Sequence, residues 1–486
     1  PRANEPPKLR TKFYAGRDPV VAALGVTRSL DAAGRPLPEV AVTLSGPVTT
    51  AQRSSDRDSG VISFGQGPGE HRLRFDRNGY LPVWRRLTLA PEAPRVLPNP
   101  RLTPRSGSPV GITPLGGQVV SNASGSVEIE FTAGAVREAG PVTLTPLTGQ
   151  TLPAFLPLGW SPLSAFWIES AVPFGTGVRA GLVPEGGARA GESLVLVRWN
   201  EAPMQWEVSA LVSGNGTNRV FAPLERPGAY ALVVADAGVA VPALAPGQPL
   251  PALAVPIPDV AGLTARGTVQ PAASPASLDP EQVTGQARLE VRHAGARLPS
   301  GWLLRGEVTE TYLLKDGSLR LTPQYEHFVV GYQRPGDADP NTLHATFPMR
   351  PQLLFGPDQL ETASVQVTLL PEQPFDGQVL DATGGQIGVQ GVRVVVGGGQ
   401  LTGPSAIRLR RLDGAVFEKL MTSSNAVVGA FELTVDASTV GDALAARLGG
   451  APGNSRFVLA RVLSDVGFYG LQPVERLVSD AAGNLS

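Results

Sequence analysis

The sequence contains no cysteine, and its 486 residues include only four histidines and three methionines. The lack of cysteine excludes disulfide bonds, thiolate catalysis and zinc sites with cysteine ligands. Charged residues make up 17% of the chain, and the formal net charge is −1, so whole-chain electrostatics give no argument for binding nucleic acid. No apolar run reaches the ~18 residues that a membrane-spanning helix needs.

Glycine and proline are abundant instead, with 57 and 47 residues. Hydrophobic residues make up 42% of the chain, which is too much for general disorder. This combination is typical of many short strands joined by Gly/Pro turns. The length allows several domains, at about 100–200 residues each. We therefore predict an all-β fold, a multidomain string of antiparallel β-sandwiches with a Pro-rich linker.

Two stretches of the sequence share a Gly-Gly opening followed by alternating strands, at 116–147 and at 384–409. In the first copy, Val127, Ile129 and Phe131 alternate with Glu128 and Glu130, which predicts one apolar and one charged face. Each copy is followed by a second match, LSAFWIES at 163–170 and VGAFELTV at 428–435. The repetition predicts a duplicated β-sandwich module.

Composition and turn signals divide the chain into six segments. They are an N-terminal arm at 1–14, a β-sandwich at 15–105, a second β-sandwich at 106–237 with the first Gly-Gly copy, a Pro/Ala-rich linker at 238–280, an antiparallel β-domain at 281–371, and a module at 372–486 with the second copy. Apolar residues in the linker predict that 240–260 is ordered against a protein surface. The stretch 441–450 ends in glycines and is the one helix that we predict. We expect further protein to follow residue 486.

We predict no catalytic, cofactor-binding or metal-ligating residue. The histidines lie apart, with no metal-binding spacing, and the acidic loop residues of the first sandwich lack the glutamate that ends a calcium loop. The Gly-rich stretches at 65–69 and 397–399 precede no helix, so we interpret them as turns and not as phosphate sites. Glu307 and Glu310 are expected on opposite faces of one strand, which is poor geometry for a carboxylate pair. The residues concerned are His71, His293, His327 and His344, with Asp56, Asp58, Asp76 and Asn78.

Six tryptophans, at positions 84, 160, 167, 199, 206 and 302, offer two interpretations. If exposed, they would form a platform for a glycan or a protein partner. Trp199 and Trp206 have apolar strand neighbours, which favours packing in a core. We predict the second arrangement.

Short motifs resemble two known β-sandwich types. Residues 15–105 resemble the carboxypeptidase-regulatory or transthyretin-related domain, whose usual role is a rigid spacer. The residues that carry this resemblance are Gly34, Pro36, Leu37, Val40, Val42, Asp56 or Asp58, Gly60, Phe64 and Gly79-Tyr80. Residues 106–237 resemble the sandwich shared by ankyrins and netrin receptors, with 132–136 at its Pro-x-Gly-Ala-Leu position. Such domains can cleave themselves at a His-Phe-Ser turn, but here Val329 follows His327 and Phe328.

The order of the modules resembles the N-terminal region of large bacterial Rhs/YD-repeat proteins, which are similar to the teneurins of animals. Residues 146–169, 298–323 and 343–369 carry this resemblance, together with the two Gly-Gly openings. It implies a non-enzymatic, secreted or cell-surface bacterial protein region that plugs or supports a hollow YD-repeat shell around a C-terminal toxin. The shell, of the same polypeptide or its cleaved product, would be the partner, and cell-surface components are a second candidate partner. No YD-repeat occurs in these residues.

Two other classes remain open. The chain fits a bacterial surface adhesin or stalk built of β-sandwiches. It also fits a carbohydrate-binding accessory region of a secreted enzyme, which would require exposed aromatic side chains.

Overall fold

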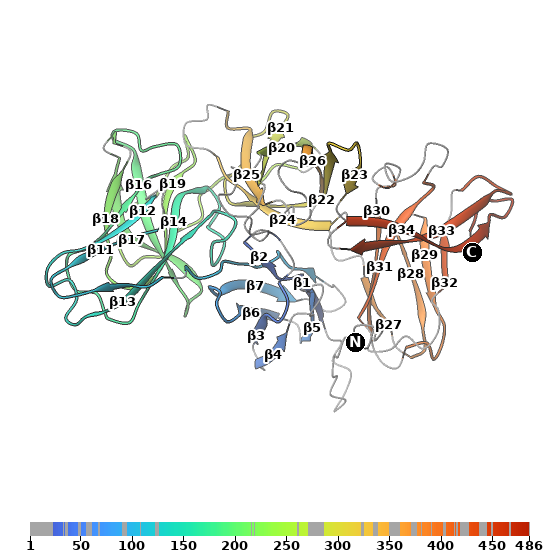
Figure 1. The fold of residues 1–486 in the computed structure, drawn as a ribbon, viewed down its shortest axis with the longest axis horizontal. Coiled ribbons are helices and arrows are strands. Elements are labelled where there is room, and N and C mark those ends of the chain that lie inside the picture. The colour runs from blue at the N-terminus through green and yellow to red at the C-terminus, as the bar shows by residue number, and fades with distance from the viewer. Residues whose placement is uncertain are drawn as a thin grey trace.

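The computed structural model confirms an all-β fold with several antiparallel sheets (Figure 1). No helix among the described residues is long and apolar enough to cross a membrane. The structure describes residues 23–485, except 33, 35–36, 47–49, 55–60, 67–68, 90–94, 107, 122–125, 215, 218, 260–261, 271–285, 322–324, 334–338, 349–359, 371–376, 381, 390, 402–404, 413, 415–416, 418–426, 437–444, 449–450 and 466–467. The predicted arm at 1–14, the residues Asp56 and Asp58, and parts of the linker, of 65–69 and of 441–450 lie outside the described residues.

The first sandwich, strands β1 to β9, packs a four-stranded sheet (β4–β3–β6–β7) and a three-stranded sheet (β5–β1–β8) around one apolar core. Two short ladders depart from the antiparallel prediction, because β1 pairs with β8, and β2 with β9, in parallel. The strands are β1 (Ala23–Arg28), β2 (Leu30–Asp31), β3 (Ala41–Ser45), β4 (Thr50–Ser54), β5 (Val61–Gln66), β6 (Gly69–Asp76), β7 (Val83–Leu89), β8 (Arg95–Val96) and β9 (Arg101–Leu102).

In the second sandwich, a six-stranded sheet (β10–β13–β14–β19–β16–β17) packs against a four-stranded sheet (β11–β12–β15–β18). The six-stranded sheet is covered on both faces, by the sandwich core on one side and by a tryptophan-rich cluster on the other. Burial on both faces explains why β16 and β19 read as almost continuous apolar runs. The strands are β10 (Val110–Ile112), β11 (Gly117–Val120), β12 (Val127–Phe131), β13 (Gly140–Leu147), β14 (Trp160–Ser170), β15 (Val178–Leu182), β16 (Ser193–Asn200), β17 (Gln205–Ser213), β18 (Val220–Pro223) and β19 (Gly228–Ala235).

Residues 244–255 of the Pro/Ala-rich segment lie against the second sandwich, which confirms this part of the contact predicted for 240–260. Leu250 and Leu253 are both buried in the tryptophan-rich cluster. Their amides donate to Trp206 O at 2.7 Å and to Leu158 O at 2.9 Å, and the Trp160 indole donates to Pro251 O at 2.8 Å. These hydrogen bonds fix the centre of the segment on the sheet, so 250–253 is part of the sandwich and not a free spacer.

The third module, strands β20 to β26, contains a sheet of β20–β21–β25 and a sheet in which β22 pairs with β23, β24 and β26. Its apolar core lies between them and includes Leu289, Val308 and Tyr312. The strands are β20 (Leu263–Gln270), β21 (Gln286–His293), β22 (Trp302–Leu314), β23 (Leu319–Leu321), β24 (Tyr325–Gly331), β25 (Thr342–Pro348) and β26 (Leu360–Leu370).

The last module, strands β27 to β34, has two three-stranded sheets (β27–β30–β31 and β28–β29–β32) and a hairpin of β33 and β34. Its core gathers Ile387, Val394, Ile407 and Leu409. The strands are β27 (Gly377–Leu380), β28 (Gly385–Val389), β29 (Val392–Val396), β30 (Ser405–Leu412), β31 (Ala430–Asp436), β32 (Ala445–Leu448), β33 (Arg456–Asp465) and β34 (Phe468–Val478).

The predicted helix at 441–450 is wrong for its described part. Ala445–Leu448 forms β32, which pairs antiparallel with β29 from Val392↔Leu448 to Val395↔Ala445. Helix propensities differ by only a few tenths of a kcal/mol per residue, so pairing within a sheet readily overrides them. The local composition favours a helix, but pairing with β29 stabilises a strand here.

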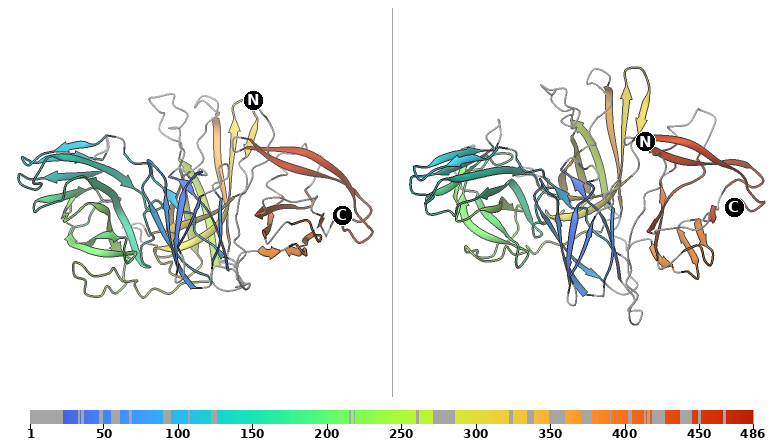
Figure 2. Two further views of the ribbon diagram at one scale, coloured as in Figure 1. Left: turned by 90° about the horizontal axis from the view of Figure 1, so that it is seen from below. Right: turned by 60° about the horizontal axis from the view of Figure 1, so that its bottom comes forward.

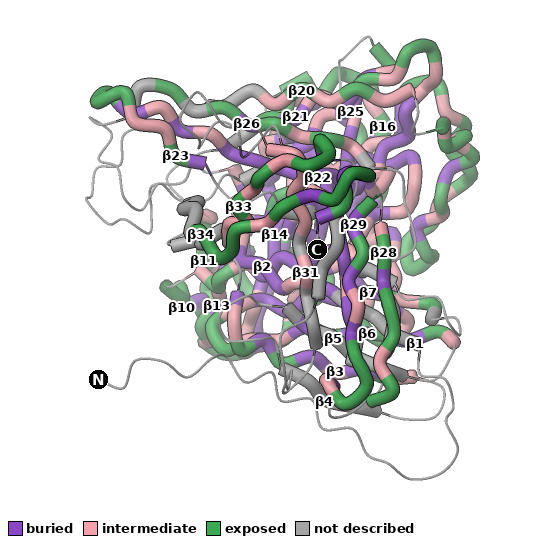
Figure 3. Tube along the Cα trace, turned by 90° about the vertical axis from the view of Figure 1, so that its right-hand side faces the viewer, coloured by how far each residue is buried: buried purple, intermediate pink, exposed green. Residues whose placement is uncertain are grey.

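The modules form an elongated row in which the second sandwich and the last module lie at opposite ends (Figures 1 and 2). The first sandwich and the third module lie side by side between them (Figure 2). Buried residues run along the strands, and exposed residues gather at the loops (Figure 3). The first sandwich and the third module both contact the second sandwich.

Candidate functional site

The Gly-Gly openings of both copies have the same backbone geometry. Gly116 and Gly117 have φ angles of 98° and 157°, and Gly384 and Gly385 have 81° and 157°. A Cβ atom on Gly116 would lie 2.5 Å from Phe131 O, and one on Gly384 would lie 2.3 Å from Val396 O. The turn therefore requires glycine for its positive φ and for the close approach of the paired strand.

The strands that follow are also arranged alike in the two copies. Strand β11 pairs with β12 and β12 with β15, while β28 pairs with β29 and β29 with β32. In the facing sheets, β10–β13–β14 corresponds to β27–β30–β31. The second copy thus reproduces six strands of the second sandwich.

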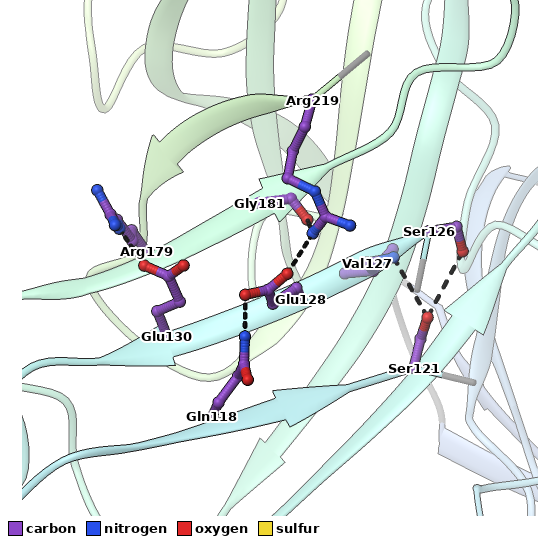
Figure 4. A network of polar contacts seen from close by, with 9 residues as sticks. All are labelled: Gln118, Ser121, Ser126, Val127, Glu128, Glu130, Arg179, Gly181 and Arg219. Atoms are coloured by element: carbon purple, nitrogen blue, oxygen red, sulfur yellow. Dashed lines mark hydrogen bonds and ion pairs between the residues drawn. The ribbon is translucent and has the colours of Figure 1, made fainter. Parts of the chain in front are cut away.

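The outer face of the first copy is charged, as the alternation in 127–131 predicts (Figure 4). Glu128 accepts hydrogen bonds from Arg219, at 2.5 Å, and from Gln118, while Glu130 pairs with Arg179. Apolar side chains of the same strand point into the core. Ion pairs at such half-exposed positions contribute about 0–1 kcal/mol each, so this network marks a solvated face and not a reactive site.

The second copy is less complete than the first. Strand β14 pairs with β13 on one side and β19 on the other, whereas β31 pairs only with β30 among the described strands. The second sequence match places Phe431 and Leu433 at the positions of Phe166 and Ile168. Phe166 and Ile168 are fully buried, and Phe166 stacks on Tyr230 of β19, but Phe431 and Leu433 are half-buried. Among the described strands, the second copy therefore has an open sheet edge with a partly uncovered apolar face.

Tryptophan side chains join the first sandwich to the second. Trp84 of β7 stacks on Trp167 of β14, with ring centroids 6.1 Å apart and planes at 6°, and contacts Trp199 of β16 at 5.8 Å. Its amide donates to Pro153 O at 2.8 Å. Five of the six tryptophans are buried and Trp302 is half-buried, which confirms the core-packing prediction for Trp199 and Trp206. Trp84, Trp167 and Trp199 therefore form part of the buried interface between the two sandwiches.

Hydrogen bonds join the second sandwich to the third module. The Gln150 amide group bonds both ways with Val330, donating to its O at 2.7 Å and accepting from its N at 3.2 Å. The Ser161 hydroxyl donates to the Ser300 hydroxyl at 2.7 Å, and Gly159 N donates to Ser300 O at 2.7 Å. Hydrogen bonds from side chains and from the backbone therefore fix the position of the third module relative to the second sandwich.

Buried arginines also make contacts between modules. Arg101 of the first sandwich contacts the His327 ring of the third module. Arg410 of the last module lies 3.4 Å from Glu307 of the third, with both side chains at most 10% exposed. The ion pair of Arg410 and Glu307 fixes geometry more than it stabilises, because desolvation offsets most of the attraction in a buried ion pair.

A cavity of about 600 Å³ lies where the first three modules meet. The first sandwich contributes the side chains of β7, the second contributes the 154–157 loop and the turn between β16 and β17, and the third contributes β22 and β24. Its walls are mainly apolar and aromatic, with three arginines, Arg85, Arg86 and Arg305. A concave apolar site with a few polar groups is the usual form of a small-molecule site.

Glu307 and Glu310, weighed from the sequence as a carboxylate pair, contact different partners. Glu307 pairs with Arg410, while Glu310 accepts a hydrogen bond from Tyr312 at 2.7 Å. His327, Phe328 and Val329 lie inside strand β24 and not in a turn. Within the described ranges, no group of three histidine, aspartate or glutamate side chains could hold a metal ion.

Two residues that the sequence did not single out are Arg85 and Asp236. Strand β6 faces β7 with Leu73 opposite Arg85 and Phe75 opposite Val83, so Arg85 occupies an inward position of an amphipathic strand. The sequence could have pointed to Arg85, because an arginine stands where the strand alternation predicts an apolar side chain. Asp236 follows the last strand of the second sandwich and gave no such signal.

Asp236 is buried, and its environment disfavours the charged carboxylate. Its Oδ2 accepts from Ser300 N at 2.8 Å, while its Oδ1 has no hydrogen-bond partner among the described residues. Burial raises the pKa of Asp236 above its ordinary value, against the hydrogen bonds from Ser300 and the charge of Arg297. As pH falls, the folded protein then binds a proton before the unfolded chain does, so folding gains stability as pH falls through the folded-state pKa.

We therefore expect wild type to gain stability relative to Asp236→Asn as pH falls from 7 to about 4. Urea unfolding followed by tryptophan fluorescence measures this difference. Asp339→Asn is a control with the opposite sign, because hydrogen bonds from Thr342 and Asn341 lower the pKa of Asp339. Wild type should lose stability relative to that control variant as pH falls below about 4. Parallel pH profiles of wild type and Asp236→Asn would contradict the assignment.

Comparisons with known proteins identify no family. No protein-family profile and no curated protein matches the sequence. Two crystal structures of BcpA, the major pilin subunit of Bacillus cereus, are similar at 10% sequence identity and a TM-score of 0.13. The structure of a BcpA variant with one substitution aligns over 76% of this chain and 90% of its own, and the BcpA structure without that substitution over 67% and 84%. A TM-score this low carries no argument about fold or function.

Proposed function

We propose that this chain is a non-catalytic structural region of a large exported bacterial protein of the Rhs/YD-repeat, teneurin-like type. In this role it is a spacer and plug that caps or supports a shell around a C-terminal toxin. Its partner is the YD-repeat shell, of the same polypeptide or its cleaved product, and its place is outside the cell or at the cell surface. The module order and short motifs of the sequence support this proposal.

The observation that carries the proposal is the open edge of the second copy. In the second sandwich, β19 covers the edge of β14 and the side chains of Phe166 and Ile168. The corresponding edge of β31 is unpaired among the described strands. Exposed sheet edges pair readily with an incoming strand. A strand supplied by the shell would complete this sandwich and attach it.

The contacts between the first three modules fit the spacer role. A spacer must hold a fixed length and direction, which requires interfaces that resist bending. Such interfaces are provided by the stacked tryptophans, by the hydrogen bonds between Gln150 and Val330, and by the hydrogen bond between Ser161 and Ser300.

The test is expression of the parent gene with its downstream region, followed by purification through a tag on this chain. We expect a YD-repeat shell to copurify, and to remain bound after any proteolytic processing. A partner strand should also protect the amides of β31 from hydrogen exchange. Downstream sandwiches with a cell-wall anchor, and no shell, would instead establish the adhesin or stalk alternative.

The carbohydrate-binding alternative has less support. A glycan platform needs exposed aromatic rings, and five of the six tryptophans here are buried. These tryptophan side chains are engaged in packing within and between modules.

A further inference from the structure

The cavity at the junction of the three modules contains a buried cation that lacks an anionic partner among the described residues. Arg85 is 4% exposed, and its Nη1 donates to two backbone oxygens, Trp84 O at 2.8 Å and Pro153 O at 3.4 Å. Its guanidinium carbon lies 4.2 Å from the centre of the Phe155 ring. Its Nε has no hydrogen-bond partner in the described part of the chain. The described residues therefore leave part of the hydrogen-bonding capacity of this buried guanidinium unused.

The rest of the cavity wall offers Arg85 no negative charge. The lining includes Arg86 and Arg305 as further cations, and none of the described side chains that form it is acidic. Burial lowers the pKa of Arg85 to about 9, and the one nearby group that opposes this shift is the Tyr332 hydroxyl. A buried charge without a counter-ion is costly, and such groups are normally paired. An anion in the cavity would supply the missing partner.

The remaining lining residues of the cavity indicate what kind of molecule would carry the anionic group. Trp199, Trp206, Phe155, Leu303 and Phe328 present apolar and aromatic surface around the space. A volume of about 600 Å³ falls within the range of small-ligand sites, about 300–1,000 Å³. A bare inorganic ion would leave most of this surface in contact with water.

We propose that the cavity between the first three modules binds a small organic anion, with one carboxylate or sulfonate group on an aromatic or acyl body. The acidic group accepts hydrogen bonds from the Arg85 guanidinium, and the apolar body lies against the tryptophan and phenylalanine side chains. This site is independent of the open edge of β31 and does not rest on the proposed function. A ligand here would touch all three modules and so stabilise their arrangement.

The experiment uses the full chain and a pair of fluorescent probes that differ in charge. 8-Anilinonaphthalene-1-sulfonate is the anion, and N-phenyl-1-naphthylamine is its neutral analogue. Probe fluorescence, with energy transfer from the tryptophans, measures affinity and stoichiometry. We expect one tight site for the sulfonate. Octanoate should displace it, and 1-octanol at the same concentration should not.

Three variants locate the site. Arg85→Met removes the charge and should weaken sulfonate binding about tenfold or more, while leaving the neutral probe within about twofold. Leu303→Trp fills the cavity and should weaken both probes. Arg266→Met removes an exposed arginine that does not line the cavity and should change neither.

The proposal is overturned if Arg85→Met binds the sulfonate as wild type does, or if it loses both probes equally. Equal competition by octanoate and octanol in the wild-type protein would also overturn it, and this measurement needs no variant. Retained sulfonate binding in Leu303→Trp would place the probe elsewhere on the molecule and overturn the assignment to this cavity. None of these results bears on whether a shell pairs with β31.

Discussion

Trp84→Ala is expected to lower the free energy of unfolding by about 4 kcal/mol, the range for removing a buried tryptophan. The ring packs against both Trp167 and Trp199, and it is 4% exposed. Its removal leaves a cavity at the interface and ends the stacking contact, which adds about 1 kcal/mol beyond simple burial. Most of the loss should fall on the interface, because Trp84 packs outside the core of its own sandwich.

Urea unfolding and limited proteolysis measure this loss. In wild type the first two sandwiches should unfold together, and in Trp84→Ala their transitions should separate, with cleavage between β9 and β10. Leu211→Ala, at a position 56% exposed on β17, is the control and should stay within about 0.5 kcal/mol of wild type. A double-mutant cycle with Trp167→Ala isolates the pair. Additive effects of the two substitutions would show that the stacking contact contributes nothing.

Gly384→Ala is expected to destabilise the last module by about 3 kcal/mol or more, through backbone strain and overlap. The φ angle of 81° is unfavourable for alanine, and the new Cβ would lie 2.3 Å from Val396 O. The oxygen belongs to the paired strand β29, so relieving the contact means breaking the β28–β29 ladder. Faster hydrogen exchange in both strands measures the effect.

Gly399→Ala is a matched control. Gly399 has the same φ of 81°, but a Cβ there meets nothing within 4 Å. It should therefore cost only the conformational strain of about 1–2 kcal/mol. In the first copy, Gly116 and Gly134 form the equivalent pair, with a Cβ contact of 2.5 Å at Gly116 and open space at Gly134. Equal effects of Gly384→Ala and Gly399→Ala would mean that close strand approach is not the constraint.

Much of the strand pattern was predictable because it depends on neighbouring residues. The alternation of 127–131 predicted the inward and outward faces of β12, and the structure gives the same alternation of burial. The Gly-Gly openings predicted before alternating strands at 116–147 and 384–409 precede β11 and β12 in the first copy, and β28 and β29 in the second. Turn glycines and apolar alternation act over a few residues, so the sequence displays them directly.

The candidate site was not predictable in the same way. The cavity takes its walls from β7, from the loop at 154–157 and from β22 and β24, which are far apart in the chain. Arg85 could have been noticed as an inward arginine, but its lack of an acidic partner in the cavity wall depends on all of these segments together. Asp236 is buried next to another module, whose Ser300 donates a hydrogen bond to it, and its sequence neighbours do not predict this burial.

By itself, the sequence determined an all-β chain without cysteine chemistry, the repeated Gly-Gly turns and the alternating faces of 127–131, because these follow from composition and short-range pattern. Only the tertiary structure decided that 445–448 is a strand, since its pairing with β29 outweighs local propensity. It likewise decided that tryptophans join modules and that, among the described residues, a buried arginine lines a cavity with no acidic lining and β31 has an unpaired edge. Each of these depends on which distant segments meet, and no local pattern encodes that.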